Sequence, residues 1–542
     1  MTQSMQCQIV VLTWTATLLG LSHSNVYTSS VKIKNMVLTE ENILNSLHTE
    51  VINLRNDTAL SVFSKFYHHR IPIVKELQND VHLQAYLKHP NGIYLSIKQF
   101  ANEYQNLRSA LGSQPSPAVQ LHLSSIADER DLVGARLSFI RLQKVYSLNA
   151  SDMIIGNYLG WSGPELDEID ALKIGEAAFT EGHLDLTIQW MYEALAMTKK
   201  SEPPIGVGNF EEPVSATGKI LALLGRSYLR QGLHEKASEM YTQATYLDPR
   251  DDNVIALKHE LVNKPHITEA PITDENLQRL CLLQNKLPNN KFDPRLNCVY
   301  RQVILPYYRF KQELISVSPY VALFYDVISD LESQSIINFS QAKLKRGMIE
   351  FHGKIVKKEY RTSDLSFVTD EEMPMIERLS KRVGDITNLR TVEYKPGESL
   401  SAEPFQVVNY GMGGHFSMHY DPLNEITLSR PDMYVQAYQG GNRVATFLIY
   451  LSDVEEGGST VFTKADIAVR PVKNMALFWY SYTPSGEFDT DTVHAGCPVV
   501  VGHKWVTNKW MWLYGNTFTR RCGLTQDATQ LDIDQHMMKG WA

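Results

Sequence analysis

The sequence predicts a multidomain α + β protein with an N-terminal helical region, a tetratricopeptide-type helical repeat domain and a C-terminal β-rich domain. Its 542 residues are too many for one ordinary hydrophobic core, so roughly two to four domains are expected. Apolar residues recur with helical periodicity in the first half, and short β-rich runs follow from about residue 318. Hydrophobic residues make up 43% and charged residues 21% of the chain, which indicates a globular protein.

Residues 1–24 are predicted to be a signal peptide. The apolar run Ile9–Leu21 is thirteen residues long, which is too short to cross a bilayer and typical of the hydrophobic segment of a signal. Small residues follow, and we expect cleavage near Ser24. The alternative interpretation is a buried core segment. No later stretch has the length and apolar character of a transmembrane helix.

Residues 25–145 are predicted to form a helical assembly domain. The stretch "EENILNSLHTEVINL" places apolar side chains along one helix face, namely Ile43, Leu44, Leu47, Val51 and Leu54. Similar stretches lie near 73–87 and 93–111, with the turn sequence "HPNG" between them. Such helices need a partner surface. The periodicity leaves open whether this chain or a second subunit provides it.

Residues 146–255 are predicted to form a peptide-binding domain of tetratricopeptide type. In "LLGRSYLRQGLHEKASEMYTQATYLDP" six residues have the spacing of that repeat: Gly225, Tyr228, Ala237, Tyr241, Ala244 and Pro249. An earlier and weaker copy matches at Gly175, Ala178 and Ala194. Repeats of this kind bind extended peptides, and the alternative is a spacer of helical pairs.

Residues 256–317 are predicted to be a connector with a disulfide. Outside the signal the chain has four cysteines in two sequence-local pairs, which favours Cys281–Cys298 and Cys497–Cys522, although three connectivities are possible. Disulfides and N-glycosylation both occur in the secretory pathway. Glycosylation sequons begin at Asn56, Asn149 and Asn338.

Residues 318–522 form the predicted β-rich domain, and 523–542 form a C-terminal tail. Runs such as "RVATFLIYLSDV", "IAVRPVKNMALFWY" and "PVVVGHKWVTNKWMW" are rich in β-branched and aromatic residues. Several short strands in succession favour a sandwich or a jelly roll.

Potential metal ligands lie close together in this β-rich domain. In a strand, residues two apart point to the same face, so His419 and Asp421 can meet one metal ion. A second triplet of this kind, His183-Leu184-Asp185, falls at the turn inside the first helical repeat, where we interpret it as a solvated helix start. His494 follows His419 beside a later strand, and two histidines with one carboxylate form the facial triad of Fe(II) oxygenases.

Lys504 adds a second feature to this pattern. It lies ten residues after His494 inside the apolar run "VVVGHKWV", where a lysine faces either solvent or an anion. Inside a jelly roll, the distal carboxylate of 2-oxoglutarate would be such an anion. The alternatives concern each feature separately. His494 would be an ordinary loop histidine, and Lys504 would be an edge-strand residue. On ligand type alone, the protein would be a zinc hydrolase. The net charge of −8 and the absence of a long Lys/Arg run argue against nucleic-acid binding.

The chain resembles the α subunit of collagen prolyl 4-hydroxylase over nearly its whole predicted mature length. The resemblance is most specific in "NYGMGGHFSMHYD", "GNRVATFLIYLSDVEEGGSTVF" and "HAGCPVVVGHKWVTNKW". It implies that the β-rich domain is a double-stranded β-helix. It also implies that His419, Asp421 and His494 bind Fe(II) and that Lys504 holds 2-oxoglutarate.

The resemblance implies further roles. Tyr410 and Thr446 would lie near 2-oxoglutarate, and Trp510 would line the substrate side of the site. The implied reaction is hydroxylation of peptidyl proline with conversion of 2-oxoglutarate to succinate, and L-ascorbate would keep the iron reduced. The family's α subunits assemble with protein disulfide isomerase into an α2β2 tetramer in the endoplasmic reticulum lumen. The chain ends in "MMKGWA", without a retention signal of its own, and the partner would supply one.

Three positions depart from the family pattern. Trp512 stands where a histidine is expected near the iron-bound end of 2-oxoglutarate. Phe416 replaces a tyrosine three residues before the first ligand, which removes a hydroxyl from the substrate side. The helices that match the family's tyrosine-rich peptide groove carry instead Phe179, Leu184, Leu223, Arg226 and Leu229. Tyrosine rings stack on proline, so these changes predict a different preference for peptides.

The sequence therefore predicts a peptidyl-proline 4-hydroxylase subunit. One alternative is a catalytically weak subunit that serves in peptide binding or assembly. The other is a 2-oxoglutarate oxygenase that hydroxylates lysine or the 3-position of proline. A catalytically weak subunit would not consume 2-oxoglutarate, whereas an active enzyme would. The position of the new oxygen in the product distinguishes a proline 4-hydroxylase from an oxygenase with another target.

Overall fold

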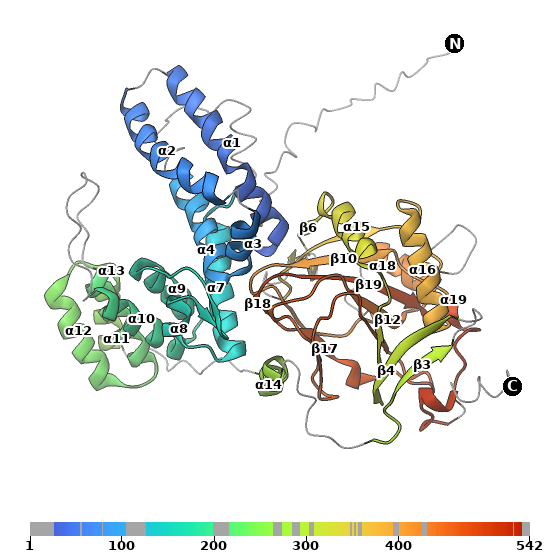
Figure 1. Cartoon of the computed structure of the whole chain (residues 1–542). Helices are drawn as coiled ribbons and strands as arrows, with labels where there is room; N and C mark the ends of the chain where they lie inside the picture. Colours follow the sequence, from blue (N-terminus) through green and yellow to red (C-terminus); the bar gives the residue numbers. More distant parts are fainter. Residues whose placement is uncertain are drawn as a thin grey trace, which may run out of the picture.

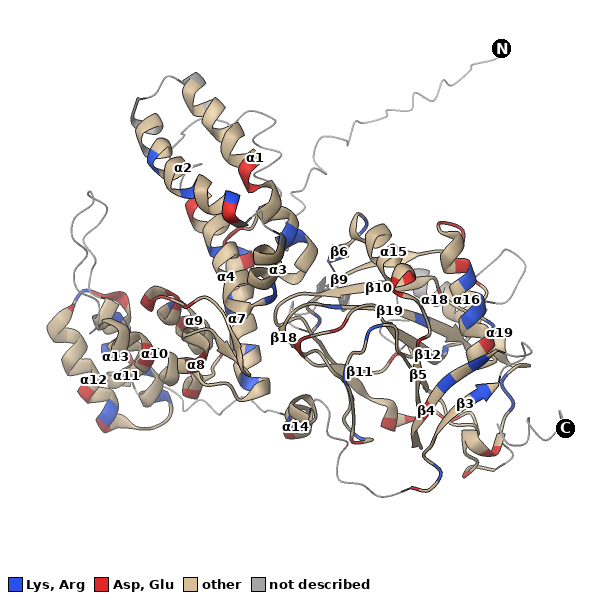
Figure 2. Cartoon of the chain, viewed as in Figure 1, with Lys and Arg blue, Asp and Glu red and all other residues tan. Residues whose placement is uncertain are grey.

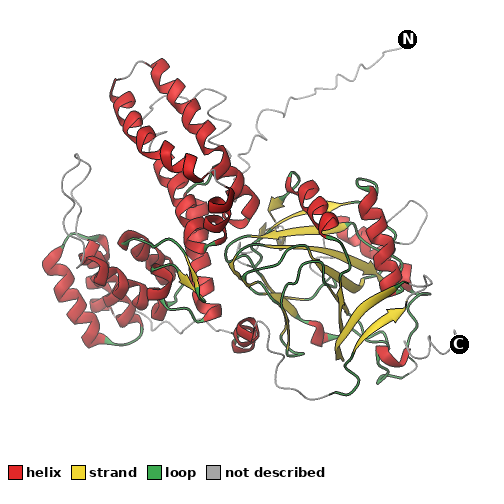
Figure 3. Cartoon of the chain, in the orientation of Figure 1, coloured by secondary structure: helices red, strands yellow, loops and turns green. Residues whose placement is uncertain are grey.

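The N-terminal half of the protein is mainly helical, and most strands gather in the C-terminal half, where a few helices flank them (Figures 1 and 3). The computed structural model describes residues 26–54, 57–77, 80–104, 126–198, 216–263, 274–283, 293–302, 308–346, 350–351, 354–355, 360–393, 400–423, 431–523 and 525–533. The predicted signal peptide, the sequon at Asn56 and the end of the predicted tail lie outside these residues. Within the described residues, none of the helices is long and apolar enough to cross a membrane.

The first helices form an antiparallel group that contains a shared apolar core. They are α1 (Ser30–Leu54), α2 (Asp57–Leu77), α3 (Asp80–Lys88), α4 (Pro90–Lys98) and α7 (Glu129–Tyr146). Asp128 begins α7 by accepting hydrogen bonds from the backbone N–H groups of Arg130 and Asp131. The predicted apolar face of α1 is buried within this core at Ile43, Leu44, Leu47 and Val51. A short helix, α8 (Ala150–Ile154), and a hairpin of β1 (Asn157–Tyr158) and β2 (Trp161–Ser162) follow.

The next helices pack as successive antiparallel neighbours. They are α9 (Glu168–Thr180), α10 (Leu184–Thr198), α11 (Ala216–Arg230), α12 (His234–Leu247) and α13 (Asp252–Asn263). Gly182 and Gly232 occupy the same place in the α9–α10 and α11–α12 turns, and both have a positive φ, which glycine adopts without strain. Gly175 and Gly225 allow close helix packing, because a Cβ atom would lie 2.1 Å from Met191 and 2.5 Å from Leu257, respectively.

The C-terminal region is built on an antiparallel sheet of nine strands that differ in length. In spatial order these strands are β3 (Cys298–Gln302), β4 (Arg309–Val317), β5 (Tyr320–Tyr325), β16 (Ala476–Tyr480), β12 (Arg443–Tyr450), β19 (Lys504–Trp512), β10 (Phe405–Tyr410), β9 (Asp364–Val368) and β6 (Lys345–Arg346). The sheet thus begins before the boundary predicted at residue 318. Helices α15 (Asp330–Gln341) and α16 (Pro374–Thr387) cover one face through a core that includes Ile336, Ile376 and Leu379.

A four-stranded sheet covers part of the other face. Its order is β11 (Phe416–His419), β17 (His494–Gly496), β14 (Thr460–Phe462) and β15 (Ile467–Val469). The core between the sheets joins Tyr410 and Tyr450 of the larger sheet to Phe462 and Val469 of the smaller one. The structure therefore has a helical N-terminal region and a C-terminal sheet domain, as the sequence predicts.

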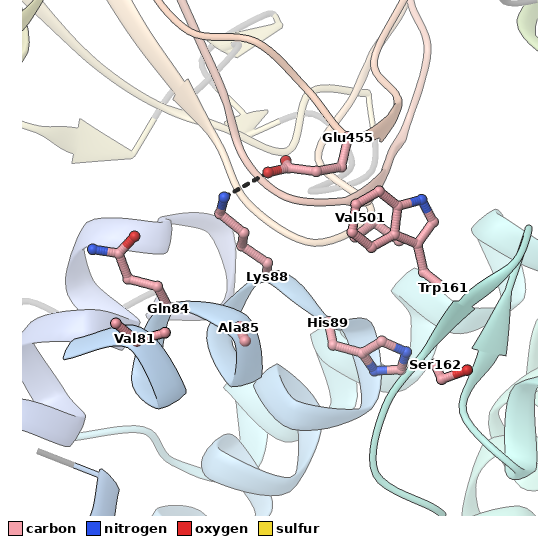
Figure 4. Close-up of a pocket in the computed structure, with 9 residues that line it drawn as sticks. All are labelled: Val81, Gln84, Ala85, Lys88, His89, Trp161, Ser162, Glu455 and Val501. Atoms are coloured by element: carbon pink, nitrogen blue, oxygen red, sulfur yellow. Dashed lines mark hydrogen bonds and ion pairs between the residues drawn. The ribbon is translucent and has the colours of Figure 1, made fainter. Parts of the chain in front are cut away.

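The helical region contacts the sheet domain at several points. Thr28 Oγ1 donates a hydrogen bond of 2.7 Å to Asp364 in β9, and the backbone N–H of Ser30 donates to Asn409 in β10. A separate cavity of about 580 Å³ lies between α3, the β1–β2 hairpin and loops of the sheet domain (Figure 4). At its edge Lys88 and Glu455 form an ion pair of 2.5 Å.

The disulfide prediction from sequence proximity is wrong. Cys281 pairs with Cys497, 216 residues away, while Cys298 and Cys522 are exposed and have free thiols. The pairing follows from the position of α14 (Glu275–Leu283), which packs on α7 and on strands β14 and β15. Asn276 and Arg279 of α14 bind Thr463 and Asp466, respectively, and this contact brings Cys281 close to Cys497, which directly follows β17 (His494–Gly496).

Candidate metal centre

The two predicted histidine ligands lie opposite each other on paired strands. β11 and β17 are antiparallel, and His419 is in register with His494. Asp421 follows two residues after His419, so its carboxylate returns toward both rings. Its Oδ1 lies 3.8 Å from Nε2 of His419 and 3.8 Å from Nε2 of His494. The three ligand atoms all lie within 4.8 Å of one another, close enough to bind one metal ion.

Hydrogen bonds fix the orientation of both imidazoles. Nδ1 of His419 lies 2.8 Å from the carbonyl oxygen of Ser417, and Nδ1 of His494 lies 2.9 Å from that of Thr492. Because a carbonyl can only accept, each Nδ1 carries the proton and each Nε2 keeps its lone pair. The unprotonated nitrogens therefore face Asp421, which is the arrangement that a divalent metal requires.

Burial favours the ligand forms of these groups. It lowers the pKa of His419 to about 3, with a further contribution from His494. Burial alone would raise the pKa of Asp421, but the two histidines and a hydrogen bond from Thr446 outweigh it, and the pKa is lowered. His419 is therefore neutral and Asp421 ionised at neutral pH. A donor set of two imidazoles and one carboxylate fits Fe(II) and leaves coordination positions open.

Within the described residues, this is the only such group of three. The second triplet, His183-Leu184-Asp185, does not join it. Asp185 accepts a hydrogen bond of 2.6 Å from Gln231, on the next helical pair. This contact supports the interpretation of the triplet as part of a helix start.

Lys504 is a buried cation on the larger, nine-stranded sheet, which packs against the sheet that carries the histidines. It begins β19 and is in register with Tyr410 of β10, so both side chains point to the interior face. Its Nζ donates to the carbonyl oxygen of Gly458 at 2.7 Å and lies 3.5 Å from Thr460 Oγ1. Burial lowers the pKa of Lys504 to about 7, and none of the described carboxylates forms an ion pair with it. An anionic ligand would supply the missing charge.

Thr446 contacts the candidate ligand Asp421 directly. Its hydroxyl donates a hydrogen bond of 2.5 Å to Oδ2 of Asp421, which leaves Oδ1 directed at the histidines. Thr446 is in register with Trp510 on β19 and belongs to the same interior face. In the structure it contacts Asp421, and its position near 2-oxoglutarate, which the family resemblance implies, stays a prediction.

The predicted substrate-side residues surround the histidines and Asp421. Phe416 stacks on His419 with ring centroids 3.6 Å apart, and Arg361 lies 4.5 Å above the Phe416 ring. The guanidinium of Arg443 lies 3.8 Å from the centre of the Trp510 ring. The structure therefore brings Phe416, Trp510, Tyr410 and Thr446 into one region with the metal ligands and Lys504.

Arg443 is a candidate site residue that the sequence interpretation missed. It binds Glu403 through Nε at 2.6 Å and through Nη2 at 2.8 Å, and its Nη1 donates to the carbonyl oxygen of Asp421 at 3.1 Å. One signal in the sequence could have indicated it. Like Lys504, it is a cation within an apolar strand, in "GNRVATFLIY".

Trp512 lies in an apolar environment. It is completely buried and packs with Leu400, Leu423 and Ala437. A Cβ atom on Gly440 would lie 2.6 Å from the Trp512 ring, so this glycine provides the room for it. Trp512 thus packs against Leu423, which follows Asp421, and its indole N–H has no hydrogen-bond partner among the residues that the structure describes.

Comparison with known proteins gives consistent matches. Residues 405–512 match the model of the 2OG-Fe(II) oxygenase superfamily, and residues 29–160 match that of the prolyl 4-hydroxylase alpha-subunit N-terminal region. Human prolyl 4-hydroxylase subunit alpha-3 is 33% identical over 72% of this chain and 75% of its own length. Subunit alpha-1 of Caenorhabditis elegans is 30% identical over 93% of this chain and 92% of its own.

Among solved structures, a viral collagen prolyl hydroxylase from Paramecium Bursaria Chlorella virus-1 is 25% identical. The match covers 35% of this chain and 94% of that one, with a TM-score of 0.27. We base the assignment on the sequence relatives, which span most of the chain. The sheet domain is a 2-oxoglutarate- and Fe(II)-dependent oxygenase domain, and the chain belongs to the family of prolyl 4-hydroxylase α subunits.

Proposed function

We propose that this chain is the catalytic α subunit of a peptidyl-proline 4-hydroxylase that acts on proteins of the secretory pathway. In the proposed reaction one C–H bond of proline becomes C–OH, while 2-oxoglutarate and O2 become succinate and CO2. One observation carries the proposal. A buried facial triad of His419, Asp421 and His494 shares a domain with Lys504, a buried cation that no described carboxylate pairs.

The residues have distinct roles in this proposal. His419, Asp421 and His494 would hold Fe(II), which would supply the activation of O2 and the oxidation of the substrate. Lys504 would bind the distal carboxylate of 2-oxoglutarate by a charge-assisted hydrogen bond. Tyr410 lies beside Lys504, with the Lys504 Nζ atom 5.6 Å from its ring centre, and would close the same end of the site. Phe416 and Trp510 would contact the proline substrate, and L-ascorbate would restore oxidised iron.

The other regions would bring substrate and partner subunits to this site. Helices α9 to α12 would act as tetratricopeptide-type pairs that bind extended peptides, and the two sheets would form a double-stranded β-helix. The helices of 25–145 would serve in assembly with protein disulfide isomerase in the lumen of the endoplasmic reticulum. Asn149 and Asn338 have exposed side chains that are accessible to glycosylation there.

Succinate release from 2-oxoglutarate tests the proposal. The full chain, co-expressed with protein disulfide isomerase, is assayed with no peptide, with a (Pro-Pro-Gly) repeat and as the His419→Ala variant. We expect succinate formation that requires the peptide and is lost in the His419→Ala variant. Succinate that forms without peptide would point to another substrate. Iron binding without any succinate would contradict the proposal and favour a peptide-binding subunit.

A further inference from the structure

Helices α9, α11 and α13 lie side by side and are linked by ion pairs across one face. Lys219 of α11 lies 2.5 Å from Glu176 of α9, and Arg226 of α11 lies 2.7 Å from Glu260 of α13. Basic and acidic residues occur together on this part of the ribbon (Figure 2). We call this surface the α9–α11–α13 face.

The cations of α11 form a continuous row on this face. Lys219, Arg226 and Arg230 are spaced at i, i+7 and i+11, which places them on one side of a helix. Their side chains are 29%, 16% and 27% exposed, so each can be reached from solvent. Leu223 and Leu229, which the sequence comparison assigned to a peptide groove, are buried beneath the surface.

Arg226 and Arg230 share one aromatic platform. Their guanidinium carbons lie 4.8 Å and 4.3 Å from the ring centre of Phe179, which is itself buried. Stacking on an aromatic ring holds a guanidinium in a fixed plane while its N–H groups remain able to donate at the ring edge. The two arginines therefore form a positioned pair of cations, of which Arg226 is turned toward α13 and Arg230 is the more exposed.

The charges of this face do not balance. Lys173 and Lys219 share Glu176, and Arg226 and Arg230 share Glu260. Four cations thus meet two carboxylates, in a chain whose formal net charge is −8. The nearby Asp185 is engaged at the edge of the face by Gln231.

The hydrogen bonds of the arginine pair leave donors unused. Glu260 accepts all three of its bonds through Oε1, from Nε and Nη2 of Arg226 and from Nη2 of Arg230. Arg226 also donates from Nη1 to Asn253. Among the described residues, Arg230 donates only from Nη2, so its other N–H groups are available to a second carboxylate.

We propose that the α9–α11–α13 face binds extended, proline-containing peptides that carry acidic side chains, and that Arg226 and Arg230 select them. The face has an excess of positive charge, a planar pair of guanidiniums and free donors, which together complement a carboxylate on a peptide. This inference rests on the proposed function, because it names the class of substrate that the hydroxylase takes. Glu260 is then an internal carboxylate that competes with the peptide carboxylate for Arg226 and Arg230.

The test compares three labelled peptides that differ only in charge, (Glu-Pro-Gly)5, (Gln-Pro-Gly)5 and (Lys-Pro-Gly)5. Their binding to the full chain is followed by fluorescence anisotropy, without iron or 2-oxoglutarate. We expect the Glu peptide to bind about tenfold more tightly than the Gln peptide at low salt, and the Lys peptide more weakly than both. Equal affinities for the three peptides would overturn the proposal.

Variants assign the preference to the face. Arg226→Gln with Arg230→Gln should reduce the advantage of the Glu peptide to within about twofold. Arg250→Gln, an arginine in the α12–α13 turn outside the face, is the matched control and should retain it. A preference that survives the double substitution, in protein with an unchanged unfolding temperature, would contradict the role of the two arginines.

Glu260→Gln gives the sharper result because it removes the competing carboxylate. The Glu peptide should then bind about threefold more tightly, while the Gln peptide is unaffected. Parallel losses for all peptides would mean that Glu260 only supports the fold, which would contradict its role as a competitor. Peptide-stimulated succinate formation is measured separately, so that failure of the charge preference and failure of the hydroxylase proposal are distinguishable.

Discussion

Thr446 donates a hydrogen bond of 2.5 Å to Oδ2 of Asp421, and Oδ1 of the same carboxylate faces both His419 and His494. The hydroxyl thereby leaves Oδ1 as the oxygen that faces the candidate metal position. Such contacts to a metal ligand commonly contribute a factor of about 10 to 100 to metal affinity. The metal centre thus depends on β12 as well as on the strands that carry its histidines.

Thr446→Val should therefore weaken Fe(II) binding by about tenfold, because the substitution keeps the shape and removes the donor. Thr446→Ser keeps the hydroxyl and serves as the control, with metal affinity close to that of the unchanged chain. Anaerobic titration with Fe(II), or with Co(II) followed by its absorption, measures both. Equal affinity of the Val and Ser variants would contradict the role of the hydroxyl.

Binding of 2-oxoglutarate should depend on pH through Lys504. Burial lowers the pKa of Lys504 to about 7, and a bound dicarboxylate favours the charged amine. Binding should therefore take up a proton above about pH 7, and affinity should fall as the pH rises further. Calorimetry in buffers of different ionisation enthalpy measures this uptake. Lys504→Met should abolish the uptake and weaken binding, and a Met variant with unchanged proton uptake would refute the assignment.

Lys504 should also affect the stability of the ligand-free protein. The unfolded chain has the ordinary lysine pKa of about 10.4, so between about pH 7 and 10 it binds more protons than the folded chain. The contribution of Lys504 to the free energy of unfolding should accordingly rise with pH through this window. Denaturant titrations at several pH values should show a rise that Lys504→Met reduces. If the free energy of unfolding depended on pH identically in the original chain and in Lys504→Met, the lowered pKa of Lys504 would be contradicted.

The disulfide should fasten α14 to the sheet domain. Removal of Cys281 or Cys497 by substitution with Ser should lower stability by roughly 4 kcal/mol, because the bond closes a loop of over two hundred residues. Cys298→Ser and Cys522→Ser are the controls, since both residues are exposed and have free thiols, and each should change stability little. Peptide mapping without reduction would identify the pairs directly. A Cys281–Cys298 peptide would contradict the structure.

Trp512 should act mainly through packing. It is completely buried with Leu400 and Leu423, so Trp512→His removes apolar volume and places a polar ring in that cluster. We expect a loss of roughly 3 kcal/mol, with Trp512→Phe closer to the unchanged chain. Thermal unfolding monitored by circular dichroism compares the two. A His variant as stable as the original, with faster turnover, would show that Trp512 limits the chemistry instead.

Some features of the site were predictable because they are local. His419 and Asp421 are only two residues apart, at and just after the end of β11, and Lys504 is conspicuous within an apolar strand. The Cys281–Cys497 bond was not predictable, because it depends on where α14 packs in three dimensions. The same holds for Thr28 and Asp364, which are distant in sequence and joined by one hydrogen bond. The partition into a helical and a sheet region followed from periodicity, whereas the order of the nine strands required the tertiary structure.

The product of the reaction tests the central claim most directly. The full chain is incubated with a (Pro-Pro-Gly) peptide, 2-oxoglutarate, Fe(II) and isotopically labelled O2, and the peptide is hydrolysed and analysed by mass spectrometry. The account predicts 4-hydroxyproline with one labelled oxygen atom, formed in step with succinate and absent in the His419→Ala variant. Succinate without hydroxyproline, or hydroxyl at another position or residue, would contradict it.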